Sequence, residues 1–412
     1  MDVWDRRLHQ VGLLIGFTPF NVDKSRNLIL RVNWMSIQAF YFVLVTVLTQ
    51  LILIFYCGSV ASLISRKGIA FALRSTGWIG GLATTNAMQW IIIARHDKIV
   101  DHLNATYLLL GRKSSANLKW QNDKKMSFIF GLIFLGILPI IAVSGHICFL
   151  PGDVYLHNLL QVYRPDYEPF WNIISKVIHC YSGVIYLLGT FLIDFLLIHF
   201  SMGYSRHFEE INQHIMLLKA EAPTLLARKG VTNIAFEVDQ KPKKAGLEVC
   251  TKSTNSWSLR TYLRDHLRLQ NSLETFNKTF DGIILAFPIQ IFVMVLALLF
   301  SVVRGELCSV LETGIYVCVG AQYLFRSYVG LRTFGKVHES GTTTKSILLR
   351  DLQIQYEQHH LESEMIFEVE SFLRTVDDVA FKAGSYLAFS PHFLISFYGA
   401  LVSYTAILIQ SF

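Results

Sequence analysis

The sequence has little charge. Only 16% of its 412 residues are Asp, Glu, Lys or Arg, whereas soluble domains carry about 25%. Hydrophobic residues make up 52% of the chain and aromatic residues 13%. This composition excludes an ordinary soluble domain and indicates a membrane protein with several spans. The aromatic content suits a lipid-facing surface with interfacial anchors.

Motifs for catalysis and for metal binding are also missing. The sequence contains no nucleophile elbow, phosphate loop or metal-ligand cluster. The six cysteines have no Cys-x-x-Cys spacing and outline no disulfide framework, although one bridge between Cys57 and Cys148 stays open. We therefore expect no enzyme activity, no cofactor, no metal site and no nucleic-acid partner.

No typical signal peptide is found in the first 30 residues. The stretch VGLLIGF is short, lacks a small-residue cleavage site and is followed by charges. We therefore expect the amino terminus to stay in the cytosol and the first span to act as a signal anchor.

Seven charge-poor stretches are long enough to cross a bilayer, which takes roughly 20 apolar residues. Their only charged residues are Asp194 in the fourth stretch and Glu312 in the sixth. The stretches lie at 34–57, 75–94, 126–152, 177–205, 282–303, 307–325 and 383–412. The sequence therefore predicts an all-α membrane protein with seven transmembrane helices.

The distribution of basic residues predicts the orientation. With the amino terminus inside, the segments predicted to be cytosolic contain 30 Lys and Arg residues, against 4 in the outer loops. The positive-inside rule then places the amino terminus in the cytosol and the carboxyl terminus outside. The glycosylation sequons at Asn104 and Asn277 would both lie inside, where they stay unmodified.

We divide the chain by these spans. Residues 1–330 would form six transmembrane helices with cytosolic extensions, and 204–279 would be a cytosolic extension with a mobile loop over 221–257. Residues 331–386 would form cytosolic anchor helices, and 390–412 the last transmembrane helix.

One amphipathic helix is predicted before the last span. Within SEMIFEVESFLRTVDD, the residues Met365, Ile366, Val369, Phe372, Leu373 and Val376 form one apolar stripe at helical spacing. The polar face is acidic, and an anionic membrane surface attracts basic helices. We therefore expect this helix to pack in a cytosolic bundle instead of lying alone on lipid.

The last span is predicted to begin at Ser390-Pro391, because Ser suits an N-cap and Pro suits the first helical position. The helix before it would extend to about Leu387. One face of the last span carries mostly small and polar residues: Ser396, Ala400, Ser403, Ile407 and Gln410. This face is open to two interpretations, close helix packing and a water-lined surface.

The carboxyl-terminal residues 367–412 resemble the signature of insect gustatory receptors. That family ends in Thr-Tyr, five mostly apolar residues and then Gln-Phe. Ser403-Tyr404, 405–409 and Gln410 stand in those places here. Phe372, Gly384 and the Ser-Pro break also fit the family pattern.

The resemblance implies a tastant-gated, non-selective cation channel in the plasma membrane. It implies a homotetramer, or a hetero-oligomer with related receptors, whose last helices line a shared pore. The pore and gate residues would be Ser403, Ile407, Gln410, Ser411 and Phe412. Two departures from the family are Ser403 in place of Thr, and Ser411, which displaces Phe412 by one position and thereby by about 100° around a helix.

The ligand pocket is expected in the outer half of each subunit, where aromatic residues meet a few hydrogen-bonding groups. Candidates by depth are Trp78, His146, Trp171, His179, Tyr181, Glu312 and Tyr316. Glu312 is the best of these because an acid in a span usually faces a cavity or a partner. The alternatives are a partner for Glu312 in Lys176 or Arg304, an interfacial anchor for Trp171, and a helix contact for His179. Asp194 lies deeper, and we expect it to have a structural partner.

Three other functions are considered. A G-protein-coupled receptor would have the opposite orientation. A transporter would often show internal repeats, which are missing here. An odorant-type channel of the same superfamily is closer, although the gustatory ending favours taste. Thr405 stands where sugar receptors often carry an acid, so a bitter or other non-sugar tastant is favoured.

Overall fold

The computed structural model describes residues 3–114, 168–235, 245–303, 310–358 and 363–411, apart from positions 15, 24, 26, 27, 377, 378 and 385. Helices dominate these residues, as the sequence predicts. The elements are α1 (Val3–Leu14), β1 (Asn21–Asp23), β2 (Leu28–Leu30), α2 (Ile37–Ser114), α6 (Glu168–Ala235), α7 (Ala245–Val303), α8 (Val310–Gln358), α9 (Ser363–Thr375), β3 (Lys382–Ala383), β4 (Leu387–Ala388) and α10 (Pro391–Ser411).

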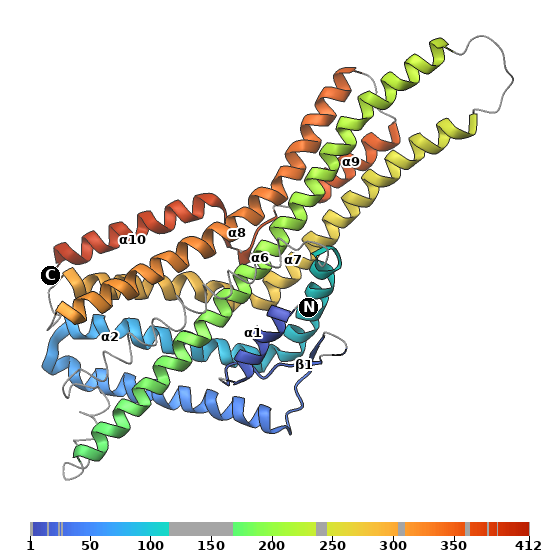
Figure 1. Cartoon of the computed structure of the whole chain (residues 1–412). Coiled ribbons are helices and arrows are strands. Elements are labelled where there is room, and N and C mark those ends of the chain that lie inside the picture. The colour runs from blue at the N-terminus through green and yellow to red at the C-terminus, as the bar shows by residue number, and fades with distance from the viewer. Residues whose placement is uncertain are drawn as a thin grey trace.

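Helix α2 doubles back on itself (Figure 1). Its 78 residues would span about 117 Å if the helix were straight. However, the Asn86 side-chain amide donates a 3.1 Å hydrogen bond to the carbonyl oxygen of Thr46, which precedes it by 40 residues. The two legs of α2 therefore lie side by side, and they carry the first and second predicted spans.

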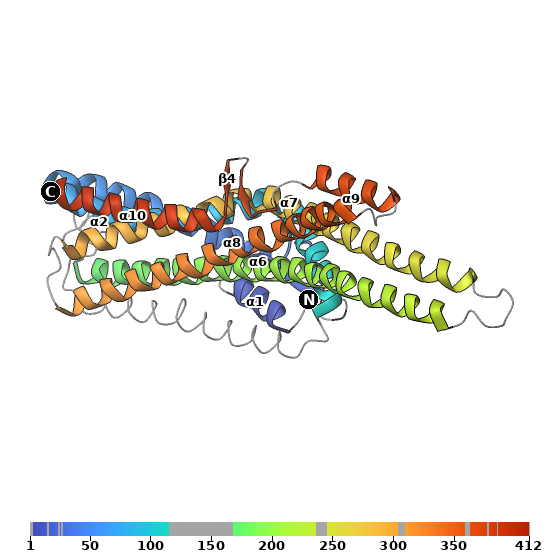
Figure 2. The same cartoon turned by 90° about the horizontal axis from the view of Figure 1, so that it is seen from above.

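The long helices α6, α7 and α8 form the centre of the molecule. Helices α6 and α8 run in the same direction, since Asp194 pairs with Arg326 and Asn212 bonds the carbonyl oxygen of Ser340. Helix α7 contacts α2, α6, α8 and α10. At one end α6 and α7 extend beyond the bundle, with α9 alongside, whereas α10 ends at the other (Figures 1 and 2).

Four segments of the described helices are long and apolar enough to cross a membrane: Ile37–Gly58, Ile185–Leu217, Leu259–Val302 and Pro391–Gln410. They correspond to the first, fourth, fifth and seventh predicted spans. The second stretch is helical in α2, and the sixth is helical in α8 from Val310 onward, where the described residues begin. The third stretch, 126–152, lies outside the described residues.

The structure corrects two of the predicted boundaries. Helix α6 continues to Ala235 and α7 begins at Ala245, so most of the loop predicted over 221–257 is helical. The helix predicted to reach Leu387 ends at Thr375. The chain then forms the β3–β4 hairpin, because Gly384 adopts a φ of 62° that only glycine adopts readily.

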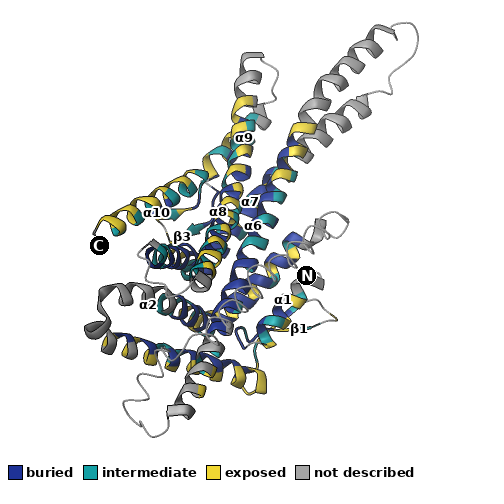
Figure 3. Cartoon of the chain, turned by 60° about the vertical axis from the view of Figure 1, so that its left-hand side comes forward, coloured by how far each residue is buried: buried dark blue, intermediate teal, exposed yellow. Residues whose placement is uncertain are grey.

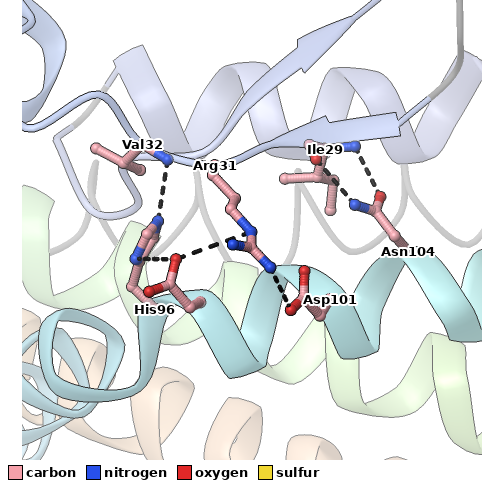
Figure 4. A network of polar contacts seen from close by, with 7 residues as sticks. Ile29, Arg31, Val32, His96, Asp101 and Asn104 are labelled. Atoms are coloured by element: carbon pink, nitrogen blue, oxygen red, sulfur yellow. Dashed lines mark hydrogen bonds and ion pairs between the residues drawn. The ribbon is translucent and has the colours of Figure 1, made fainter.

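A second small hairpin, β1–β2, ties the amino-terminal segment to the second leg of α2 (Figure 4). The Asn104 side chain accepts a hydrogen bond from the Ile29 amide at 2.8 Å and donates one to its carbonyl oxygen at 2.9 Å. The Val32 amide donates to His96 Nε2 at 2.9 Å, and Arg31 pairs with Asp101 at 2.7 Å. We call residues 28–32 the amino-terminal strap.

The predicted packing of α9 is confirmed. Val369, Phe372 and Val376 are buried, and the Phe372 ring lies 5.2 Å from the ring of His266 on α7. On the polar face, Glu368 forms an ion pair with Arg260. The apolar stripe therefore faces other helices of the chain.

We predict that His102 makes the protein less stable in acid. Burial lowers the pKa of this histidine from 6.5 to about 4, beside Phe276 and Phe280. Between these pH values the unfolded chain binds a proton at His102 and the folded protein does not, so the free energy of unfolding falls as the pH falls. His102→Phe is expected to lose less thermal stability than wild type between about pH 7 and about pH 5.

The measurement is the thermal unfolding midpoint of the detergent-solubilised protein at both pH values. His214→Phe, which replaces an exposed histidine, serves as the control and is expected to keep the wild-type difference. An equal acid loss in wild type and His102→Phe would contradict the prediction.

Candidate functional site

The segment before α10 is held by side chains from two helices. The Asn277 amide of α7 donates to the carbonyl oxygen of Ala380 at 2.9 Å. His338 of α8 hydrogen-bonds the carbonyl oxygen of Val379 through Nδ1 at 3.0 Å. The Gly384 amide donates to the Asp281 carboxylate. These contacts give α10 a fixed base, which we define as residues 379–390.

Aromatic rings fill the space around this base. The Phe334 ring stacks on Phe381 at 5.0 Å and meets Phe389 edge-on at 5.3 Å. Phe389 in turn contacts Phe393, in the first turn of α10, at 5.0 Å. The ring contacts therefore continue from the buried Phe389 of the base to the half-buried Phe393 of the helix.

Helix α10 begins at Pro391, as the Ser-Pro break predicts. There it passes very close to α8, since a Cβ added to Gly335 would lie 3.3 Å from the Pro391 nitrogen. One face of α10 then packs on the bundle through the buried side chains Phe397 and Leu401. Phe292 of α7 contacts Phe397 and Tyr404, each at 5.8 Å between ring centroids.

The opposite face of α10 is exposed along its whole length. Six small or polar residues follow one another there at i, i+4, i+7, i+11, i+14 and i+18 spacing, and all are exposed: His392, Ser396, Gly399, Ser403, Ala406 and Gln410. We call them the outward stripe. Exposed Ile395, Val402 and Ile409 flank the stripe on one side. Figure 3 shows that α10 lies at the edge of the molecule, with exposed residues along it.

The outward stripe differs slightly from the face predicted by sequence. Ser396, Ser403 and Gln410 belong to both, and Ile407 is exposed at the margin. Ala400 is half-buried and is therefore not part of the exposed stripe. Ser411 is the last residue of α10, whereas its side chain and Phe412 lie outside the described residues.

The predicted pocket residues are placed only in part. Tyr181 of α6 and Tyr316 of α8 are half-buried against the core. Trp78, Trp171, His179 and Glu312 lie in helices α2, α6 and α8, but their side chains are outside the described part, as is the whole of His146. The structure therefore describes the side chains of two of the seven candidates, and these two lie on the neighbouring helices α6 and α8.

A buried polar cluster follows Tyr181 and Tyr316 along the same two helices. The hydroxyl groups of Tyr186 on α6 and Tyr323 on α8 hydrogen-bond each other. The Tyr186 ring lies so close to α2 that a Cβ added to Gly81 would collide with it. Glycine at position 81 therefore allows this tyrosine to lie between the helices.

The predicted partner of Asp194 is Arg326. Their charged atoms are 2.5 Å apart, and each side chain is only 3% exposed. The guanidinium also lies over the Tyr323 ring, 4.7 Å from its centroid. Arg326 was not singled out by sequence because it directly follows the sixth apolar stretch, although an acid in one span and a base at the edge of another signal such a pair. We call Tyr186, Asp194, Tyr323 and Arg326 the polar junction.

We predict that breaking the ion pair of the polar junction is costly. Arg326→Met would leave Asp194 buried and uncompensated, which lowers the free energy of unfolding by about 3–5 kcal/mol. The double variant Asp194→Leu/Arg326→Met removes both charges and is expected to recover most of that loss. Thermal midpoints of the solubilised protein measure both effects, and a double variant no more stable than Arg326→Met would contradict the prediction.

A family model described as 7tm Chemosensory receptor matches residues 6–411. The fold is similar to that of the insect olfactory receptor OR5 from Machilis hrabei, with a TM-score of 0.68 and 14% sequence identity over 99% of this chain and 98% of that one. The same receptor in complex with eugenol gives a TM-score of 0.62 at 13% identity, with the same coverage. No curated protein shows significant sequence similarity to the chain.

Proposed function

The chain belongs to the 7tm chemosensory receptor family, and we propose that it is a gustatory receptor that acts as a tastant-gated, non-selective cation channel. It is a multi-pass membrane protein. In the proposed assembly, four copies, or this chain with related receptors, surround one pore. The last helix of each subunit, α10, lines that pore.

The observation that carries the proposal is the outward stripe. A helix that crosses a membrane would not present His392, Ser403 and Gln410 to lipid, because polar groups are costly there. None of these side chains is buried against the chain's own bundle. A pore shared with other copies gives the stripe a polar environment.

The small residues of the stripe support the same arrangement. A Cβ added to Gly399 would meet nothing within 4 Å, so packing within the chain does not require glycine at this position. Small residues allow helices of different subunits to approach closely in a membrane. Four α10 helices could therefore converge around an axis, with the Gln410 amides forming a polar ring near the pore's end.

The gating residues would be Ser403, Ile407 and Gln410, with Ser411 and Phe412 beyond them. Ser411 occupies the position where the family has its Phe. Phe412 would therefore form the hydrophobic part of the gate only if the end of the helix turns its ring towards the pore. Ile407, exposed at the margin of the outward stripe, is the described apolar side chain best placed to supply this part.

The tastant pocket is proposed between α2, α6 and α8, around Tyr181 and Tyr316. Trp78, His146, Trp171, His179 and Glu312 remain candidates for its wall. The complex of OR5 contains eugenol, a small molecule, within a protein of this fold. The aromatic side chains among the candidates suit a small, partly aromatic tastant. Thr405, which stands where sugar receptors often carry an acid, favours a non-sugar compound.

An odorant-type channel is the second candidate function. The observation that favours it is the similarity to an olfactory receptor over 99% of this chain. The ending Ser403-Tyr404 with Gln410 favours the gustatory branch. Both candidates use the same pore, and recordings with bitter compounds and with volatile odorants would distinguish them.

We predict that a glycosylation sequon placed on a short spacer after Phe412 becomes glycosylated in expressing cells. The proposed orientation puts that end of the chain outside, where the modifying enzyme acts. The measurement is a glycosidase-sensitive mass shift. A matched variant with the sequon inserted after Lys241, between α6 and α7, is expected to stay unmodified. The reverse pattern would exclude both the proposed orientation and the channel.

We also predict that Gln410 faces the conduction path. In a background with the exposed Cys57 and Cys318 changed to serine, Gln410→Cys should let an external cationic thiol reagent block most of the tastant-evoked current. Ile409→Cys, on the neighbouring flank, is the control and should show little block. The measurement is whole-cell current before and after the reagent, and equal block in both variants would contradict a pore-lining position.

A further inference from the structure

One tyrosine connects α10 to α8 by a hydrogen bond. The Tyr398 hydroxyl lies 2.7 Å from Ser327 Oγ and 3.1 Å from the carbonyl oxygen of Leu324. Its single proton can therefore be donated to either acceptor. Both partners belong to one turn of α8, so the ring of Tyr398 is tied to a defined place on that helix.

Two other hydroxyl groups of α10 form hydrogen bonds within the helix. Ser403 donates to the carbonyl oxygen of Gly399 at 2.8 Å, and Thr405 donates to that of Leu401 at 2.7 Å. Beyond Tyr398, the buried Leu401 and the ring of Tyr404 pack on the bundle. Polar attachment to the bundle therefore gives way to apolar contact after the first two turns.

The two kinds of contact resist movement differently. Apolar contact is non-directional and changes little when one helix slides on another. A hydrogen bond weakens steeply when its distance or angle changes. The energy of the Tyr398–Ser327 hydrogen bond therefore depends on the position of α10 relative to α8 more strongly than the energy of the apolar contacts does.

The position of Ser327 depends in turn on its neighbour. Arg326 is the preceding residue, and its ion pair with Asp194 joins α8 to α6. The Tyr186–Tyr323 hydrogen bond lies one turn earlier. A shift between α6 and α8 at the polar junction would thus move Ser327 relative to α10.

We propose that the Tyr398–Ser327 hydrogen bond is a latch that holds α10 in its non-conducting position and is released when the polar junction shifts. The inference rests on the proposed channel function and names how that pore is regulated. Tyr398 acts as a positioning residue: it lies on the bundle side of α10 and acts through the helix on the pore. Ligand binding near Tyr181 and Tyr316 would release the latch by favouring the shifted arrangement.

The test compares Tyr398→Phe, Ser327→Ala and the double variant with wild type, all without ligand. Loss of the hydroxyl removes one hydrogen bond, so the equilibrium between released and latched α10 should shift about fivefold. Ser327→Ala should shift it less, because Leu324 still accepts from Tyr398. The double variant should match Tyr398→Phe, since the two residues share one interaction.

Two readouts are measured on the full chain. Amide hydrogen exchange in lipid nanodiscs reports release of α10, and ligand-free whole-cell conductance reports opening. Thr405→Val is the matched control, because it removes a hydroxyl of α10 that bonds only its own helix. We expect faster exchange in α10 with unchanged exchange in α9, together with raised conductance, for Tyr398→Phe and not for Thr405→Val.

The outcomes separate the latch from the channel. Unchanged exchange in α10 of Tyr398→Phe would overturn the latch, whatever the conductance. Faster exchange throughout the molecule, or an equal effect of Thr405→Val, would also overturn it, because the bond would then be merely structural. Faster exchange confined to α10, with no conductance above untransfected cells in any variant, would support the contact and overturn the proposed channel function.

Discussion

The fixed base of α10 is the constraint on which the rest of the arrangement depends. Residues 379–390 contain non-helical backbone between two helices, and buried backbone groups need partners. Asn277 and His338 supply them for the buried Ala380 and Val379. Asp281 also binds the exposed amide of Gly384, and the rings around Phe334 exclude water. Since this segment cannot shift without breaking those bonds, α10 starts at one defined place and direction. Its outward stripe follows from that start.

The attachment of α10 to the bundle becomes weaker from its first turn towards its carboxyl-terminal end. The contacts of α10 pass from the half-buried ring of Phe393 beside buried Phe389, through the hydroxyl of Tyr398, to the half-exposed ring of Tyr404. The far part of the helix therefore costs least to displace. Proteins that switch between two arrangements place their moving parts where local stability is low, and the carboxyl-terminal part of α10 meets this condition while its base does not.

Sequence patterns predicted the features of this fold that are local. The Ser-Pro start of α10 and the stripe of α9 each depend on a few consecutive residues, and the composition of 177–205 already implied that Asp194 needs a partner. The partner Arg326 and the β3–β4 hairpin were missed because they depend on which helices meet. The sequence predicts a helix that continues to about Leu387. The bonds to Asn277 and Asp281, which lie more than 100 residues away in the chain, override it together with Gly384.

The two sequons show how a motif can have a structural explanation. Asn104 binds both backbone groups of Ile29 in the amino-terminal strap, as a neighbouring strand would, and Asn277 binds the backbone of Ala380 at the base of α10. In a fold made of long helices, the short non-helical segments have few strand neighbours to pair with. Amides projecting from helices take over that role, because one Asn side chain both donates and accepts. These hydrogen bonds explain why asparagine occupies both positions without any glycosylation. An attached glycan would displace the backbone segment that each asparagine binds.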